Sequence, residues 1–502
     1  MAPFRPAWKR SPVARQPTAL SAPSSSTSDK WAGVTGRSGR ESLHGWLSVS
    51  RSPTRRLSVV SIVSVVVLVG FGALPLPSVA AVGTVPGSSS SIEAQSTPRL
   101  DAAACSVGAD LAGLGCRLGR AQRAGDRPAV ASAVRDLIAL LGAEAGVASP
   151  VDQYRAAPSG DSPTLSSADL PGSFDLQLAA IAQGDWWSAS PSGTTAPAPL
   201  RAPADVIAGT LAARDAGAGD PARLLAVAPR GGDYLLKAQR EGGRGLFPFP
   251  DPAAKPGALF DAARRDLAQD PNRQRRIRSG WLVDDHGSGS LLFDNGLAGL
   301  AVLDLYAATR EQKWLRSAED AAAWAMNQPV VTNWNYNSFS IGFLARLSQI
   351  TGKATYLDAA VRIADLGVIP GQLPNGPNEG RWLDSHNARG VYHWILVRNL
   401  TLLTAALPAG HAAFGRVRSS LTRALNVADR DIAAEGINAP DGALCALSAV
   451  AQLPVAAIPD VGQSNALRTV GQYAWGRQQA GSLGVKPGAW GEFLRTTAVR
   501  SR

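Results

Sequence analysis

The sequence predicts an all-α protein whose main domain is an (α/α)6-type toroid, a closed ring of about six helical hairpins. The first observation is a repeat, because residues 293–325 and 336–367 share one pattern. Each has a small polar cluster, an apolar helix, a Thr-led turn, an aromatic–Leu pair and an Ala-rich helix. Asn295 and Asn337 are 42 residues apart, as are Thr309 and Thr351. Helical hairpins with a repeat of this length form an open solenoid or a closed ring.

The second observation is the contrast between the two helices of each unit. The first is rich in Gly, Ala and Leu, as a crowded inner helix should be, and the second is amphipathic, with charges such as Arg316, Glu319 and Asp320. Long loops rich in Trp, Asn, Asp and Gly precede the inner helices and would emerge at one end of a ring. Further units are predicted to begin at residues 386 and 440, and residues 221–240 resemble the outer helix of an earlier unit.

The N-terminal part predicts export or membrane anchoring. Residues 1–56 are rich in Ser, Pro and Arg and should be disordered. No charged residue occurs from 57 to 74, Arg55 and Arg56 precede this stretch, and residues 78–80 form a small-x-small cleavage site. Residues 57–83 are therefore either a cleaved signal peptide or a transmembrane anchor through residues 57–74. Both alternatives place residues 84–502 outside the cytoplasm, secreted or held at the membrane.

Composition sets the remaining boundaries and excludes some classes of function. Residues 1–56 hold ten Lys or Arg and two acids, so the rest of the chain has no marked basic excess and no nucleic-acid partner is expected. The cysteine spacing fits no metal site, and no cofactor is expected. A disulfide between Cys105 and Cys116 stays open. The predicted order is a linker (84–100), a helical hairpin (101–146), an irregular Pro/Ser/Gly-rich segment (147–204) and the toroid (205–502).

Part of the repeat resembles a known family. The stretch NWNYNSFSIGFLARLSQITGKATYLDAAVRIAD (333–365) resembles bacterial endo-α-mannanases of glycoside hydrolase family 76, in which W-x-Y-N-Q-G, T-G-D, Y-L and A-x-x-I-A-D follow in this order. The stretch VYHWILVRNL (391–400) resembles the family's F-K-G-I-F-x-R-x-L. The resemblance covers roughly residues 290–430 and implies a six-hairpin toroid and a retaining glycosidase. Where the family has an Asp-Asp pair, this chain has Asp294-Asn295, and Ser338 replaces the family's Gln.

Carboxylates are the first catalytic candidates, because a glycosidase needs two of them beside the scissile bond. Asp294 opens a predicted inner helix and is the best single candidate, with an N-cap as its alternative role. Asp284 and Asp285 lie in a Gly-rich loop and either act in catalysis, form the turn or bind a cation. Asp384 is a further possible partner for Asp294.

Two of the five histidines form the second candidate group. With Ser385 as N-cap, a helix should begin near His386, and His386, Arg389 and His393 would share one face. They would then act in acid/base chemistry or bind substrate, with Arg389 holding an anionic or hydroxyl group. The alternative is a capped helix with hydrogen-bonded histidines. A metal site is not favoured, because histidines at i and i+7 chelate poorly.

Aromatic residues in the loops before the inner helices predict sugar stacking, with core packing as the alternative for each. Asn337 begins an inner helix, and its alternative role is helix-entry hydrogen bonding. The predicted substrate-binding residues are Trp281, Trp334, Tyr336, Asn337, Trp382, Asp384, Arg389 and Tyr392.

Three functions remain open from the sequence. The first is an exported glycoside hydrolase acting on a polysaccharide in the toroid cleft. The second is a polysaccharide lyase or epimerase on uronic-acid glycans, in which Arg389 holds the carboxylate and His386, His393 or Tyr392 moves the proton. The third is a non-catalytic toroid of the cell envelope that binds a glycan or a protein.

Overall fold

The computed structural model describes residues 110–148, 155–156, 163–184, 199–254, 258–268, 270–454, 457 and 463–500. All of them belong to one compact unit, Ser58–Arg502. They are mostly helical, and the described strands have two residues each, which confirms the all-α class. The predicted segments 1–56, 57–83 and 84–100 lie outside the described residues.

The helices alternate along the chain between two packing roles. The first half contains α2 (Leu111–Ala124), α3 (Arg127–Leu141), α4 (Asp175–Gln183), α5 (Arg201–Ala216), α6 (Pro221–Gly242), α7 (Ala258–Ala268), α8 (Arg273–Arg276), α9 (Ser290–Thr309) and α10 (Gln312–Met326). The second half contains α11 (Trp334–Thr351), α12 (Ala354–Gly367), α13 (Gly390–Ala406), α14 (Phe414–Glu435), α15 (Pro440–Ala451), α16 (Gln463–Gln479) and α17 (Pro487–Arg500). Short 3-10 turns occur at η1 (Gly142–Glu144), η2 (Leu170–Gly172) and η3 (Ile369–Gly371).

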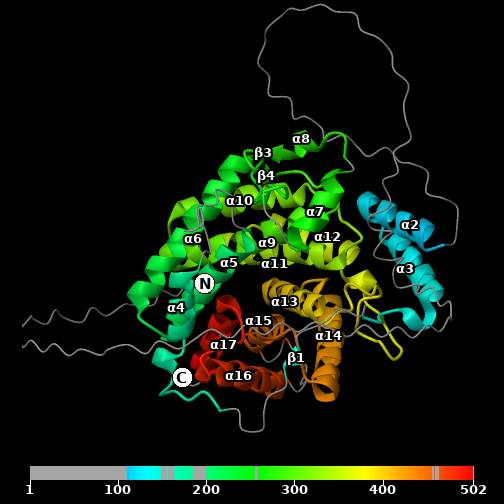
Figure 1. The fold of residues 1–502 in the computed structure, drawn as a ribbon. Coiled ribbons are helices and arrows are strands. Elements are labelled where there is room, and N and C mark those ends of the chain that lie inside the picture. The colour runs from blue at the N-terminus through cyan, green and yellow to red at the C-terminus, as the bar shows by residue number, and fades with distance from the viewer. Residues whose placement is uncertain are drawn as a thin grey trace, which may run out of the picture. The chain divides into compact units, whose positions relative to one another are not determined.

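Six of these helices make a closed circuit of contacts (Figure 1). In order, α5 packs against α9, α9 against α11, α11 against α13, α13 against α15, α15 against α17, and α17 again against α5. Helices α6, α10, α12, α14 and α16 each pack against the circuit helix that precedes them in the chain. The two repeated units of the sequence correspond to α9–α10 and α11–α12, and each hairpin gives its first helix to the circuit.

Neighbouring helices of the circuit run in the same direction. A Cβ added to Gly296 of α9 would lie 2.7 Å from the Cβ of Phe339 in α11, and one added to Gly299 would lie 2.6 Å from the ring of Phe343. The contacting positions advance together along the two helices, so α9 and α11 are parallel. Glycine permits this close approach because it has no side chain.

The junction of α5 and α17 has the same geometry. Asp205 lies against Gly488 and Gly209 against Gly491, where an added Cβ would lie 2.3 Å from the Gly209 carbonyl oxygen. Because these pairs also advance together, α5 and α17 are parallel. The N-terminal ends of α17, α5, α9 and α11 therefore lie at one end of the circuit.

Helix α4 completes the surroundings of α17. The Nε1 of Trp490 donates to the Ser173 carbonyl at 2.7 Å, and the Nε2 of Gln177 donates to the Val485 carbonyl at 2.9 Å. The sequence analysis treated residues 147–204 as irregular, and this is wrong for α4 and for the first turn of α5. The Pro- and Ser-rich flanks concealed a short apolar helix with buried Leu178.

Small sheets and a helical pair complete the described structure. Strand β1 (Arg155–Ala156) pairs antiparallel with β5 (Ile437–Asn438), and β4 (Trp281–Leu282) pairs with both β2 (Phe249–Pro250) and β3 (Ile277–Arg278). The predicted hairpin of residues 101–146 appears as α2 and α3, with Gly125 in the left-handed region (φ 73°) between them. Cys116 is disulfide-bonded, and Cys105 lies outside the described residues.

Among the described residues, α9 is the one helix long and apolar enough to cross a membrane by length and composition. Two thirds of its most apolar window (67%) is buried inside the structure. It is therefore a core helix of the circuit.

Candidate functional site

Arg201 and Asp294 join the N-terminal ends of α5 and α9. The guanidinium donates twice to the carboxylate, from Nε to Oδ1 at 2.8 Å and from Nη2 to Oδ2 at 2.9 Å. The Asp294 side chain is only 2% exposed, whereas that of Arg201 is 31% exposed. Burial lowers the pKa of Arg201, but the Asp294 carboxylate outweighs this effect and leaves the pKa raised. Asp294, the best catalytic candidate of the sequence, is thus committed to an ion pair.

Aromatic rings hold the Arg201 side chain in place. Its guanidinium carbon lies 3.9 Å from the ring centroid of Phe293 and 5.8 Å from that of Phe249. Cation–π contacts of this kind restrict an arginine to one position. The exposed edge of Arg201 is therefore a fixed hydrogen-bond donor at this end of the circuit.

Two tyrosines from α11 and α13 share the electrostatic environment of this ion pair. Tyr336 and Tyr392 each influence the titration of Arg201, and they also influence one another. Burial raises the pKa of Tyr336 to about 12, and nearby Tyr392 and Asp294 act in the same direction. Both hydroxyls therefore keep their protons at neutral pH.

A stack of three side chains lies at the start of α13. The ring of His386 lies over that of Tyr392 with centroids 4.1 Å apart, and the Arg389 guanidinium lies 4.6 Å from the same tyrosine ring. The Nη2 of Arg389 donates to Nδ1 of His386 at 2.6 Å. Burial and the Arg389 charge lower the pKa of His386 to about 4, so its imidazole is neutral at physiological pH.

The helix carrying these residues begins later than predicted. Helix α13 starts at Gly390 with Arg389 at its N-cap, so His386 precedes the helix and shares no helical face with His393. His393 is 3% exposed, and its Nε2 lies 2.8 Å from the Ala424 carbonyl. The predicted catalytic role of His393 is therefore wrong, since the ring is enclosed in the core between α13 and α14.

Asp205 is a residue that the sequence analysis missed. It lies on α5 one turn after Arg201, is partly buried, and accepts from the Gly488 backbone at 3.2 Å. Burial raises its pKa to about 6, with the Asp441 carboxylate adding to the effect and Lys486 opposing it. Arg201 and Asp205 are spaced i, i+4 at the start of an apolar run, which is the signal that would have identified them.

Asp441 is the second missed carboxylate and belongs to α15. Its Oδ1 accepts from the Lys486 backbone at 2.6 Å, so Asp205 and Asp441 bind backbone groups two residues apart at the start of α17. Two residues span at most about 7 Å. The two bonded oxygens therefore lie no more than about 13 Å apart, a range that includes the 6.5–9.5 Å separation of inverting glycosidases.

The three tryptophans predicted to stack on sugars are core residues. Trp281, Trp334 and Trp382 are each at most 1% exposed. The indole of Trp281 donates to Glu241 at 2.9 Å, and that of Trp382 donates to the Val368 carbonyl at 2.9 Å. Their ring faces are covered by protein, so the sugar-stacking prediction is wrong for these three and remains a prediction for Tyr336 and Tyr392.

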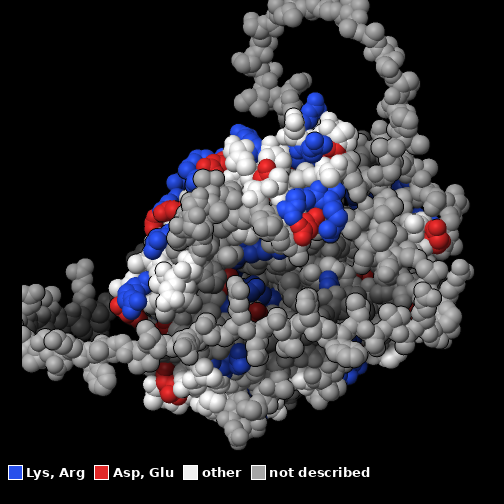
Figure 2. Space-filling model, viewed as in Figure 1, with Lys and Arg blue, Asp and Glu red and all other residues white. Residues whose placement is uncertain are grey.

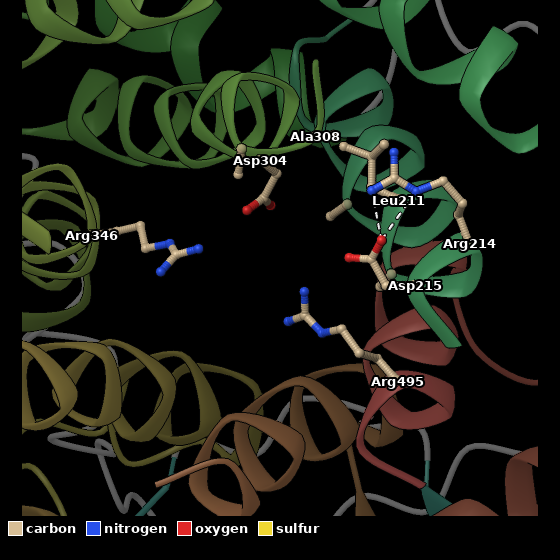
Figure 3. A pocket seen from close by; sticks show the side chains of 10 residues that line it. Leu211, Arg214, Asp215, Asp304, Ala308, Arg346 and Arg495 are labelled. Atoms are coloured by element: carbon tan, nitrogen blue, oxygen red, sulfur yellow. Dashed lines mark hydrogen bonds and ion pairs between the residues drawn. The ribbon is translucent and has the colours of Figure 1, made fainter. Parts of the chain in front are cut away.

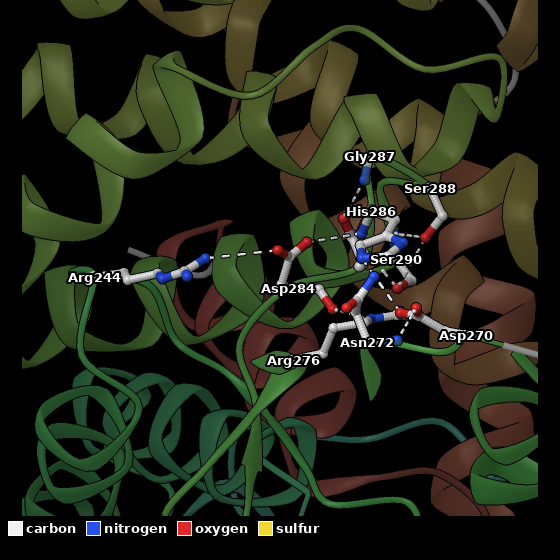
Figure 4. A network of polar contacts seen from close by, with 10 residues as sticks. Arg244, Asp270, Asn272, Arg276, Asp284, His286, Gly287, Ser288 and Ser290 are labelled. Atoms are coloured by element: carbon white, nitrogen blue, oxygen red, sulfur yellow. Dashed lines mark hydrogen bonds and ion pairs between the residues drawn. The ribbon is translucent and has the colours of Figure 1, made fainter. Parts of the chain in front are cut away.

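The loop carboxylates Asp284 and Asp285 shape the entry to α9 (Figure 4). Asp285 accepts from the Leu291 and Gly287 backbones at 2.9 and 3.0 Å, and burial raises its pKa. Asp284 accepts from the His286 backbone at 2.8 Å and lies 3.7 Å from Arg244. Their predicted catalytic role is replaced by a turn-forming one, because their oxygens are occupied by loop groups.

Asn337 and Asp384 likewise have structural partners. The Nδ2 of Asn337 donates to the Val331 and Gly367 carbonyls at 2.7 and 2.8 Å. Asp384 accepts from the Asn387 backbone at 2.9 Å, and burial raises its pKa. Both side chains are committed to the loops before α11 and α13, and neither is placed to bind substrate.

The polar groups that remain available gather in the interior of the circuit. Figure 2 shows a hollow in one face of the structure with Lys, Arg, Asp and Glu side chains in its depth. Within the described part of the chain, no group of three His, Cys, Asp or Glu side chains is placed to hold a metal ion. The candidate site comprises Arg201, Asp205, Tyr336, His386, Arg389, Tyr392, Asp441 and Lys486.

Comparison of the chain with family models and with curated proteins found no match.

Proposed function

We propose that this protein is an extracytoplasmic (α/α)6 toroid that hydrolyses a polysaccharide inside its ring. The closed circuit of six parallel-type helices, each backed by the next helix of the chain, supports the toroid. The export-like residues 57–74 and the disulfide at Cys116 support a location outside the cytoplasm, since disulfides persist in oxidising compartments. The resemblance to endo-α-mannanases of glycoside hydrolase family 76 agrees with this proposal.

One observation carries the proposal: Asp205 and Asp441 are neighbouring carboxyl groups with different environments. Asp205 has its pKa raised to about 6, as a general acid needs, while Asp441 takes a short hydrogen bond from the Lys486 backbone that favours its ionised form. In the proposed mechanism Asp205 protonates the leaving oxygen. Asp441 then activates the water that attacks the sugar, as in an inverting glycosidase.

The other residues of the site bind the sugar in this proposal. Tyr336 and Tyr392 supply apolar ring faces and protonated hydroxyls, and the fixed guanidinium of Arg201 donates to a sugar oxygen. Asp294 positions Arg201 and does not touch the substrate, because its carboxylate is buried beneath the guanidinium.

The test uses the full chain with α-mannans, other neutral glycans and polyuronates, and measures new reducing ends. Asp205→Asn and Asp441→Asn should each lower kcat by about 10²-fold or more, the usual contribution of a general acid or base. Asp294→Asn should mainly raise KM, since it loosens Arg201. Asp233→Asn, an exposed carboxylate on α6, is the matched control and should leave the rate unchanged.

Two results would contradict this assignment. If wild-type protein releases no reducing ends from any glycan, the hydrolase proposal fails. If Asp294→Asn is inactive while Asp205→Asn and Asp441→Asn keep their activity, Asp294 takes the catalytic role and the assignment to Asp205 and Asp441 is wrong.

The stack of His386, Arg389 and Tyr392 favours a second candidate, a lyase or epimerase on uronic-acid glycans. A guanidinium beside a tyrosine hydroxyl suits a substrate carboxylate and a proton at the adjacent carbon. Ultraviolet absorbance from unsaturated products of polyuronates, lost in Tyr392→Phe, would support a lyase. Reducing ends without absorbance would exclude it.

A further inference from the structure

A second polar pocket lies in the circuit, at the opposite end of the helices from the candidate site. It has a volume of about 110 Å³ and is lined from the C-terminal halves of α5, α9, α11 and α17. In Figure 3 the side chains of Asp304, Arg346 and Arg495 extend toward the same space from three different helices. A single water needs roughly 10–15 Å³ by the same kind of measure, so the pocket has room for a ligand the size of a small sugar.

The charged groups of this pocket are unequally satisfied. Arg214 and Asp215 bind each other at 2.6 Å. Arg495 donates from Nη2 to Glu492 at 2.5 Å, but its buried Nε has no partner within the described structure. The pocket therefore has one closed ion pair and one arginine with an unused buried donor.

Arg346 and Asp304 are the least committed groups. Arg346 makes one long contact, to the Gln349 side chain at 3.4 Å, and Asp304 has no hydrogen bond or ion pair with any described residue. Burial raises the pKa of Asp304, and nearby Glu492 adds to this effect. A partly buried carboxylate and guanidinium that face one space without touching are both left for a third group to satisfy.

The rest of the lining determines the size of this space. Ala208, Ala212, Ala307 and Ala308 line the pocket together with Leu211. Four alanines leave room where larger side chains would fill the interior of the circuit. Their methyl groups also provide an apolar surface on which the C–H face of a sugar can lie.

We propose that this pocket binds a small hydroxylated anion, either a sugar acid or a sugar phosphate, separately from the proposed hydrolytic site. Arg346 and Arg495 hold its carboxylate or phosphate, which guanidinium groups recognise through paired hydrogen bonds. Asp304 accepts a hydrogen bond from a sugar hydroxyl, and the alanine wall packs against the ring.

Calorimetric titration of the full chain tests this site with four probes: glucuronate, glucose 6-phosphate, inorganic phosphate and glucose. Glucuronate or glucose 6-phosphate should bind more tightly than glucose by about tenfold or more, and the stronger of the two identifies the source of the anion. Inorganic phosphate should bind more weakly than glucose 6-phosphate, because it has no ring for the alanine wall.

Arg346→Gln is the decisive variant, since it removes the least committed guanidinium and leaves no buried partner behind. It should weaken binding of the anionic sugar about tenfold, and circular dichroism should show unchanged helix content. Arg223→Gln, an exposed arginine on α6, is the matched control and should bind as wild type.

The proposal is overturned if no probe binds at millimolar concentration, if glucose binds as tightly as its anionic derivatives, or if Arg346→Gln binds like wild type. Asp205→Asn should retain the affinity of wild type for the anionic sugar. The binding result is therefore independent of whether the chain hydrolyses glycans.

Discussion

Asp205 connects the stability of the fold to pH at the scale of a single residue. Its pKa is about 3.8 in an unfolded chain and rises to about 6 in the folded protein, because burial disfavours the charge. Between these values the folded state binds more protons than the unfolded state. Stability contributed by this group is therefore present at low pH and lost as pH rises from about 4 to 6.

Asp205→Asn should remove this loss. The variant should be more stable than wild type at pH 7 by about 1–2 kcal/mol, less than the full shift implies because the carboxyl is only partly buried. Urea denaturation at pH 4.5 and pH 7 measures the difference. Equal pH dependence in Asp205→Asn and in the control Asp233→Asn would contradict the prediction.

His393 should produce the opposite dependence. Burial lowers its pKa to about 4, from the model value of 6.5. The unfolded chain then takes up a proton that the folded state refuses, so stability is lost as pH falls from about 6.5 to 4. His393→Gln, which can still donate to the Ala424 carbonyl, should reduce this acid loss by up to about 3 kcal/mol. Thermal unfolding at pH 7 and pH 5 checks it, and the variant should match wild type more closely at pH 7.

Individual residues also show what the sequence could not predict. The loop positions of Trp281, Trp334 and Trp382 were compatible with a sugar cleft, but each ring is enclosed by segments distant in the chain. Burial by such segments leaves no local pattern around a tryptophan. Arg201 and Asp205 were missed for the converse reason, since their partners on α9, α15 and α17 are more than eighty residues away.

At the scale of helices, the close contact between α5 and α17 depends on glycine. A methyl group on Gly491 would lie 2.3 Å from the Gly209 carbonyl oxygen, so the two helices would have to separate. Gly491→Ala should lower the free energy of unfolding by about 1–3 kcal/mol, the usual cost of overpacking. Urea denaturation followed by circular dichroism measures it.

Gly415 on α14 is the matched control, because an added Cβ would meet no atom within 4 Å. Gly415→Ala should keep or raise stability, by up to about 1 kcal/mol, since alanine favours the helix. A Gly491→Ala variant as stable as Gly415→Ala would show that the junction of α5 and α17 adjusts without cost.

Helix positions were predictable where the apolar period was strong and less so at helix ends. The repeated units became α9–α10 and α11–α12 as expected. The start of α13 was predicted near His386 but lies at Gly390. Asp384 and Asn387 form a side-chain-bonded turn instead, and such local bonds compete with the first turn of a helix.

At the scale of the whole described structure, Asp365 links three helices. Its carboxylate, 5% exposed, pairs with Arg416 of α14 at 2.6 Å and with Arg127 of α3 at 2.5 Å. The Nε2 of Gln122 in α2 donates to the neighbouring Leu366 carbonyl at 3.1 Å. These bonds attach the α2–α3 hairpin to α12.

Asp365→Asn should loosen this attachment. Because both arginines are partly exposed, the expected loss is about 1–2 kcal/mol. Amide hydrogen exchange should accelerate in α2 and α3 and stay unchanged in α9 and α11. Unchanged exchange in α2 and α3 would mean that apolar contacts alone hold the hairpin.

The repeat predicted much of the helical arrangement, because hairpins of similar length bury their apolar faces against their neighbours. The completion of the circuit was not predictable in the same way. Helix α4 and the start of α5 carry no recognisable repeat, and they contact α17 about three hundred residues later. Only the folded chain shows that these segments meet.

The contact of α5 with α17 also sets an order of events in time. A chain emerging from the ribosome or from a translocation channel exposes the glycine-lined face of α5 until residues 487–500 have followed. The early helices can stack in sequence, but the final docking waits for the last of them. A protein built in this way spends its synthesis unfinished, and its vulnerability to proteases and to self-association ends with one late step.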